Sequence, residues 1–235
     1  MAKRLFEAGR GTMPRAEPFF RRYAWFLLAF IVACFAGKAI FDTADLPPLT
    51  PMHHVHALSM GAWFLLFAIQ PTLLERGKVS LHRLLGRLSP LLVLCFLASA
   101  MSMTTLNWAR TGEPLIPTAN GINLLLFLSF YAAALAWRRH PAAHQRLMLF
   151  ATLSIIGPAA GRLPEIFDAS PFLAAPVVIA LQVTPLVHDF VVYRRAHPAT
   201  WISFAALCAA IPLIVGLSAS EGWAQVLDGL LGPRS

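Results

Sequence analysis

Seven apolar runs divide the chain, and the charge of the segments between them alternates from one segment to the next. Most of the runs have about 17 to 22 residues, which is the length that an α-helix needs to cross about 30 Å of hydrocarbon. The pattern predicts an all-α, polytopic membrane protein, a bundle of seven transmembrane helices. The predicted runs are Tyr23–Ile40, Val55–Leu74, Pro90–Leu106, Thr118–Trp137, Leu147–Gly161, Phe172–Tyr193 and Trp201–Ala219.

The fifth run, Leu147–Gly161, is the weakest of the seven predictions. It has only about 15 apolar residues, so it spans the hydrocarbon only if Arg146 and Arg162 at its ends extend toward the head groups. The alternative is a re-entrant segment that returns to the side from which it came. In that case the sixth helix inverts, and His188 and Asp189 move to the outer side.

The basic residues orient the chain across the membrane. Of the 19 lysines and arginines, 15 lie in the N-terminal segment and in the second, fourth and sixth loops, and 4 lie on the opposite side. The acidic residues favour the other side, which holds 7 of the 11. Because short cytoplasmic loops carry an excess of basic residues, we expect the N-terminus inside and the C-terminus outside.

Composition supports one membrane domain. The chain is 57% hydrophobic and 13% charged, which is too apolar for a soluble domain of this length. We expect a basic cytoplasmic segment at residues 1–22, the seven-helix domain at 23–219 and a short external tail at 220–235. The tail can form an interfacial helix with Trp223, Val226, Leu227 and Leu230 on one face.

The net charge of +8 indicates membrane lipids rather than nucleic acid as a partner. The excess lies in short loops that meet anionic head groups, and the chain has no nucleic-acid-binding module. It also has no phosphate loop, GxSxG or HExxH motif. Composition and motifs therefore leave open whether the protein is an enzyme.

Polar groups at membrane depth are the first candidates for a site. Asp189 lies about one turn before the basic end of the sixth helix, and Gln182 shares its helix face seven residues earlier. Gln70 lies in the inner half of the second helix. Asp189 is predicted either to take part in function or to form a structural ion pair with Arg83 or Arg146.

A second layer of candidates consists of histidines near the inner helix ends. His82, His144 and His188 approach the bundle from three separate helices, and His197 begins a fourth. Imidazoles that converge from different helices can hold zinc, iron or haem. The alternative is that each histidine caps a helix or meets lipid phosphate.

A third set lies at the outer end of the second helix. His54 and His56 fall in the run MHHVH, and Met60 follows one turn later. Thioether and imidazole together suit copper, or a haem with His and Met ligands. The alternative is that Met60 fills the core and the histidines form a polar start to the helix.

The stretch from His54 to Gly86 resembles a group of uncharacterised bacterial multi-pass membrane proteins with an HxH…W…Q…HR-x-LG pattern. Segments resembling the same group's AAHxRL…AT and RRxHxAT patterns begin at Ala142 and Arg194. The similarity to cytochrome b561-like proteins is only general. The resemblance implies a location in the bacterial inner membrane and no particular activity. The matching residues of the first pattern are His54, His56, Trp63, Gln70, His82, Arg83, Leu85 and Gly86.

Three functional hypotheses follow. The first is a redox or metal protein that holds haem b or a Cu, Zn or Fe ion through its histidines, with polar side chains around them. The second is a non-enzymatic accessory subunit of a larger membrane complex, which would have other membrane proteins as partners. The third is a transporter of a small solute or of protons. The ligands expected under the first hypothesis are His54, His56, His82, His144 and His188, supported by Met60, Gln70, Arg83, Arg146, Gln182 and Asp189.

Overall fold

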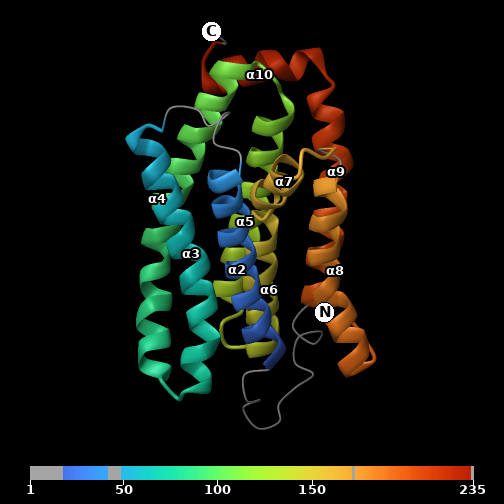
Figure 1. The fold of residues 1–235 in the computed structure, drawn as a ribbon. Coiled ribbons are helices and arrows are strands. Elements are labelled where there is room, and N and C mark those ends of the chain that lie inside the picture. Colours follow the sequence, from blue (N-terminus) through green and yellow to red (C-terminus); the bar gives the residue numbers. More distant parts are fainter. Residues whose placement is uncertain (1–17, 42–48, 171–172, 234–235) are drawn as a thin grey trace.

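The computed structural model describes residues 18–41, 49–170 and 173–233, and in this part of the chain there is no β-strand. The helices form one elongated bundle (Figure 1). They are α2 (Pro18–Phe41), α3 (Pro51–Glu75), α4 (Val79–Thr111), α5 (Leu115–Ala136), α6 (Pro141–Ser154), α7 (Gly157–Ile166), α8 (Ala174–Tyr193), α9 (Pro198–Ser218) and α10 (Glu221–Leu231).

Six of these helices are long and apolar enough to cross a membrane, and the α6–α7 pair, bent by 44°, makes a seventh if it is one span. Large apolar side chains point outward along the bundle, among them Leu58, Leu91 and Leu125. Polar side chains such as Asp189 and Thr200 are buried inside. This distribution is expected when the solvent is lipid, and it confirms an all-helical, multi-pass integral membrane protein.

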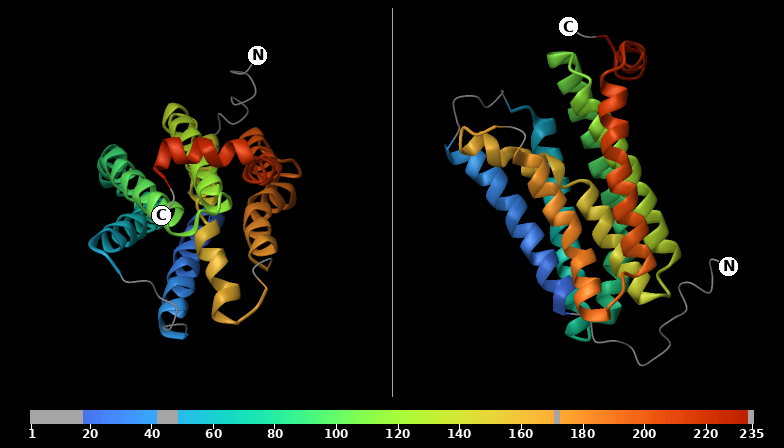
Figure 2. Two further views of the ribbon diagram at one scale, coloured as in Figure 1. Left: turned by 90° about the horizontal axis from the view of Figure 1, so that it is seen from above. Right: turned by 90° about the vertical axis from the view of Figure 1, so that its right-hand side faces the viewer.

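The helix ends gather at two ends of the bundle. At the basic end, Arg21 of α2 forms an ion pair with Glu75, the last residue of α3. At the acidic end, Lys38 Nζ near the end of α2 lies 3.3 Å from Glu165 Oε2 near the end of α7. The described chain therefore starts at the basic end and finishes at the acidic end (Figures 1 and 2). Which end faces the cytoplasm stays a prediction.

Two boundaries differ from the sequence prediction. α2 begins at Pro18 rather than Tyr23, so the end of the predicted basic segment is helical, and residues 1–17 of that segment lie outside the described residues. α4 begins at Val79 rather than Pro90 and has 33 residues. At 1.5 Å per residue it is about 50 Å long, well beyond the hydrocarbon thickness.

The tail forms the predicted helix, α10, which lies across the acidic end of the bundle (Figure 2). Its indole Trp223 Nε1 donates to Thr118 Oγ1 over 2.7 Å, and Leu227 is buried. Val226 and Leu230 stay exposed. The predicted apolar face is therefore divided: one half packs on the bundle and the other half is turned outward.

The space between α3, α4 and α5 is filled by aromatic rings. Trp63 packs edge-to-face on Phe127, with 5.0 Å between ring centroids, and also contacts Phe96 and Tyr131. The Tyr131 hydroxyl pairs with Ser89 Oγ at 2.7 Å. These buried rings make this half of the bundle a packed core rather than a cavity.

Candidate functional site

The centre of the bundle holds a broken helix. α6 ends at Ser154 and α7 begins at Gly157, while the linking residues Ile155 and Ile156 are both buried. Pro158 has no N–H for a helical bond to the Ser154 carbonyl, and the residue before a proline is biased away from helical geometry. Pro71, Pro90, Pro185 and Pro212 lie inside helices that stay single. The Gly157–Pro158 pair is therefore the sequence element that fits the break.

The broken helix is central because α6 contacts α2, α3, α5, α8 and α9. α6 alone is about 21 Å long and α7 about 15 Å, so neither is long enough to cross the hydrocarbon but the two in series are. The ion pair between Lys38 and Glu165 at the far end of α7 fits this reading, since it brings the pair to the acidic end. The short fifth run is thus explained by a bend within the bundle.

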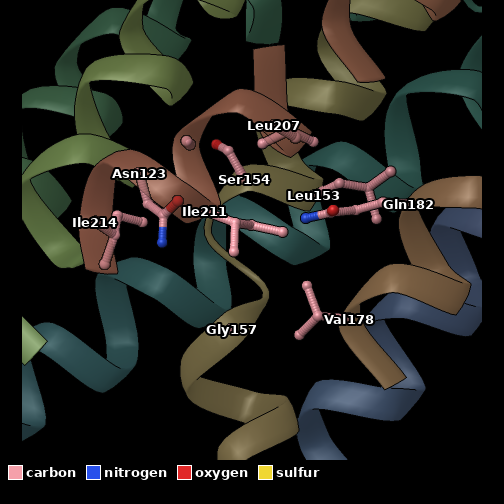
Figure 3. Close-up of a pocket in the computed structure, with 10 residues that line it drawn as sticks. Asn123, Leu153, Ser154, Gly157, Val178, Gln182, Leu207, Ile211 and Ile214 are labelled. Atoms are coloured by element: carbon pink, nitrogen blue, oxygen red, sulfur yellow. The ribbon is translucent and has the colours of Figure 1, made fainter. Parts of the chain in front are cut away.

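A small cavity lies beside the break. Its volume is about 110 Å³, and Figure 3 shows the side chains around it. Its polar lining comes from Asn123 of α5, Ser154 of α6 and Gln182 of α8, together with Gly157. The apolar lining is Leu153, Val178, Leu207, Ala210, Ile211 and Ile214.

Two amides in this cavity have unused hydrogen-bonding capacity. Gln182 is only 7% exposed, and neither it nor Asn123 makes a side-chain hydrogen bond to any residue that the structure describes. Ser154 Oγ donates to the Ala151 carbonyl over 2.7 Å and can still accept a bond. Figure 3 shows the Gln182 side chain extending toward the centre of the cavity, with Asn123 on the opposite side. Gln182 is buried and Asn123 is half-buried, and a buried amide is normally paired, so Gln182 in particular points to a bound molecule or to water.

A second buried polar group, the Arg146–Asp189 cluster, lies nearer the basic end. Arg146 Nη2 donates to Asp189 Oδ1 over 2.5 Å, and its Nε lies 3.1 Å from Oδ2. Thr200 Oγ1 and the His197 backbone N–H donate to Asp189 Oδ2 over 2.5 Å and 3.0 Å. Arg146, Asp189 and Thr200 therefore join α6, α8 and α9 through a carboxylate with all its partners in place. Of the two predicted arginine partners, Arg146 is correct and Arg83, which is exposed, is wrong.

Aromatic rings close this cluster off from the lipid. The Arg146 guanidinium lies 5.2 Å from the centroid of Phe20 and 5.5 Å from that of Tyr193. Arg146 Nη1 donates to the Ala142 carbonyl over 3.0 Å. Burial, together with Arg146 and Arg195, lowers the pKa of His197 to about 4. His197 is therefore neutral near pH 7, in agreement with its Nδ1 accepting the Ala199 N–H at the start of α9.

Pro185 lies between Gln182 and Asp189 on α8, and the three share the buried face that the spacing predicts. A proline leaves the carbonyl four residues earlier without its helical partner. Here that carbonyl belongs to Leu181, and it accepts the Tyr23 hydroxyl over 2.6 Å. The carbonyl freed by Pro185 therefore fastens α2 to α8 and is not part of the cavity.

The structure places the predicted outer histidines in different surroundings. His54 is exposed, while His53 caps α3 through Thr50 and is only half-buried. His56 Nδ1 pairs with Ser99 Oγ at 3.1 Å, which fixes α3 against α4. Met60 packs on the hydrophobic core, as its alternative reading expects.

Of the predicted inner histidines, His82 and His144 lie near each other. His144 Nδ1 pairs with the Ala134 carbonyl at 2.8 Å, and His82 lies within electrostatic range of His144. Gln70 reaches across to α4, where its Nε2 lies 3.9 Å from the position that a β-carbon on Gly86 would take. His188 lies apart from these, since its ring stacks on Phe19 with 3.8 Å between centroids. The predicted inner layer is therefore two separate groups.

Within the described residues, no group of three or more His, Cys, Asp or Glu side chains is placed to hold a metal ion. Along α4 about 25 Å separates His82 from Ser99, the partner of His56, so the outer and inner histidines cannot share one haem. Trp63 and Phe96 fill the space between them. The redox hypothesis, like the accessory-subunit hypothesis, stays a prediction.

Sequence reasoning missed Ser154 and Thr200, because neither hydroxyl stands out in an apolar run. Asn123 and the glycines of GPAAG are visible in the sequence, yet nothing in it says that they share a cavity. The usable signal was the combination of a short fifth run with a Gly-Pro pair inside it. Interrupted apolar segments of this kind point to sites at membrane depth.

The fold and site together define a multi-pass integral membrane protein with a broken central helix and a polar cavity beside the break. No protein-family model, no curated protein and no solved structure matches the chain.

Proposed function

We propose that this protein is a membrane transporter for small polar solutes, and that the cavity at the α6–α7 break is its binding site. The observation that carries the proposal is the pair of amides, Gln182 and Asn123, that line one cavity beside a broken helix without a side-chain hydrogen bond to a described residue. Broken helices at membrane depth are tolerated where the backbone lines a cavity. They are a recurring way to build transporter sites.

The break between α6 and α7 leaves room for a small solute beside the backbone. Most backbone groups at the break bond to one another, since the Ile156 carbonyl accepts the N–H groups of Ala159 and Ala160. Because Gly157 has open space where a side chain would begin, a small molecule can approach the backbone there.

The basic loops and the resemblance stated above support a location in the bacterial inner membrane. The orientation that follows has the N-terminus and the basic end in the cytoplasm. Membrane lipids are then the surrounding partner. The cavity lies roughly midway along the bundle, as expected for a site that must be reached from both sides in turn.

The test is flux into vesicles with matched glycine variants. Purified protein is reconstituted into liposomes, and uptake of radiolabelled urea, acetamide, guanidinium and acetate is measured together with proton flux, against empty liposomes. Gly157→Phe places a ring at the cavity, whereas Gly216→Phe places the same ring on the exposed side of α9. Neither glycine has a neighbouring atom within 4 Å of an added β-carbon, so both variants are expected to fold.

We expect at least one probe to enter faster than in empty liposomes, with Gly157→Phe removing the difference and Gly216→Phe keeping it. Flux that is equal in the two variants would remove the cavity from the pathway. If no probe crosses faster than in empty liposomes, the transport proposal is wrong.

A further inference from the structure

The chemistry of the cavity lining restricts the kind of solute it can hold. Its polar groups are two carboxamides and one hydroxyl, and no charged side chain lines it. The nearest buried charges that the structure describes, on Arg146 and Asp189, satisfy each other. Asp189 is seven residues from Gln182 on α8, which is about 10 Å along the helix. An ion in the cavity would therefore be buried without a counter-charge, which is strongly unfavourable.

The two amides are complementary to a particular kind of partner. Each carboxamide offers two N–H donors and a carbonyl acceptor. Gln182 and Asn123 approach from opposite sides (Figure 3), so a molecule between them can donate at one end and accept at the other. Primary amides and urea have both functions in a planar group. The volume of about 110 Å³ holds a few non-hydrogen atoms, since one water takes about 30 Å³.

We infer that the cavity selects small neutral solutes of the amide and urea class and excludes ions of the same size. Gln182 and Asn123 are the residues that determine this specificity. The inference rests on the proposed transport function and adds the substrate class to it.

The test uses pairs of probes that match in shape and differ in charge. Urea and guanidinium form one pair, and acetamide and acetate form the other. Uptake is measured in liposomes with the membrane potential clamped by an ionophore. The variants are Gln182→Met, which keeps the length and removes the amide, and Asn123→Leu, which keeps the branching. Asn107→Leu is the matched control, because Asn107 is a partly buried amide on α4 outside the cavity.

Each outcome decides one claim. We expect urea and acetamide to enter several-fold faster than in empty liposomes, and guanidinium and acetate to enter no faster. Gln182→Met and Asn123→Leu should each lower the neutral fluxes, while Asn107→Leu should not. Ion flux that is abolished by Gly157→Phe, without neutral flux, would keep the transport proposal and overturn the substrate class. Neutral flux that is indifferent to both cavity amides would overturn the specificity role.

If one amide variant fails to fold, judged by size-exclusion chromatography, the other still tests the claim because the two residues lie on different helices. Binding gives a second readout that does not depend on flux. Urea should slow alkylation of a cysteine placed at Ser154, and guanidinium at equal concentration should not. Equal protection by both would contradict charge selection.

Discussion

Two polar regions inside the bundle, the Arg146–Asp189 cluster and the cavity at the helix break, differ in how completely their groups are paired. In the Arg146–Asp189 cluster the carboxylate has an arginine, a hydroxyl and a backbone N–H as partners. In the cavity at the helix break, the Gln182 and Asn123 amides have no partner among the described residues. α8 therefore carries part of one saturated site and part of one unsaturated site, about 10 Å apart, and Asn123 of α5 completes the unsaturated one.

This difference in pairing indicates which of the two polar regions is the better candidate for a binding site. Charge alone would favour Asp189, because an ionisable residue at membrane depth is costly and is usually retained for a role. Yet a charge whose partners are all supplied by the protein has little capacity left for a ligand. Neutral amides with open donors and acceptors have that capacity. We therefore propose a structural role for the cluster and a binding role for the cavity.

The first prediction is all-or-none and concerns the broken helix that both regions share. A topology reporter fused after Glu165 should read external, because α6 and α7 in series carry the chain to the acidic end. A cytoplasmic signal there would make the pair re-entrant and move the Arg146–Asp189 cluster and the cavity relative to the membrane. The complete set should read cytoplasmic after Arg22, Arg87, Arg139 and Arg195 and external after Pro48, Glu113, Glu165 and the C-terminus.

The second prediction concerns loss of the ion pair in the Arg146–Asp189 cluster. Asp189→Ala leaves the Arg146 charge buried without its partner, which typically costs about 3–5 kcal/mol. The midpoint of SDS-induced unfolding should fall accordingly. The double variant Arg146→Met with Asp189→Leu should recover most of the loss and keep solute flux, because the cavity is untouched. A stable double variant without flux would show that the cluster takes part in transport.

The third prediction compares the two regions directly by chemical access. In a background in which Cys34, Cys95 and Cys208 are alanine, Ser154→Cys should react with a small neutral thiol reagent many times faster than Ser203→Cys. Both serines are buried, but only Ser154 lines the cavity. Equal rates would mean that the cavity is not reached by solutes from water.

The fourth prediction has the smallest effect and uses pH. The pKa of His197 is about 4 in the folded protein and about 6.5 when unfolded, because burial and Arg146 disfavour its charged form. Between these values the unfolded chain binds a proton that the folded protein does not, so stability should fall as pH is lowered from 6.5 toward 4. His197→Asn keeps a capping side chain and removes the titration. Thermal unfolding should therefore depend less on pH in this variant than in wild type across that window.

Much of the fold was predictable because lipid imposes a strong pattern on sequence. Apolar runs long enough to span the hydrocarbon can be recognised without knowledge of tertiary contacts. The same holds for basic loops on alternate sides. Residue spacing also predicted that Gln182 and Asp189 share a helix face and that the tail forms a helix. The helix starts at Pro18 and Val79 were not predictable in this way, since those segments are polar enough to resemble loops.

The predicted histidine ligands show what a sequence pattern cannot predict. Several histidines lie near helix ends, but spacing along a helix does not say which side chains converge. His56 pairs with Ser99, His144 with the Ala134 carbonyl, and His188 stacks on Phe19. The hypothesis of bound haem or metal stays a prediction, to be tested by the optical spectrum and metal content of the purified protein. A featureless spectrum without stoichiometric metal would contradict it.

By itself, the sequence determined that the chain is helical, that it lies in a membrane, and that its fifth apolar segment is unusually short. These depend on hydrophobicity and backbone geometry, which are properties of neighbouring residues. Only the tertiary structure decided that Asp189 is paired with Arg146 and that Asn123 and Gln182 face one cavity. Those facts depend on how helices from distant parts of the chain pack, and packing is fixed by the fit of whole helix surfaces rather than by any local pattern.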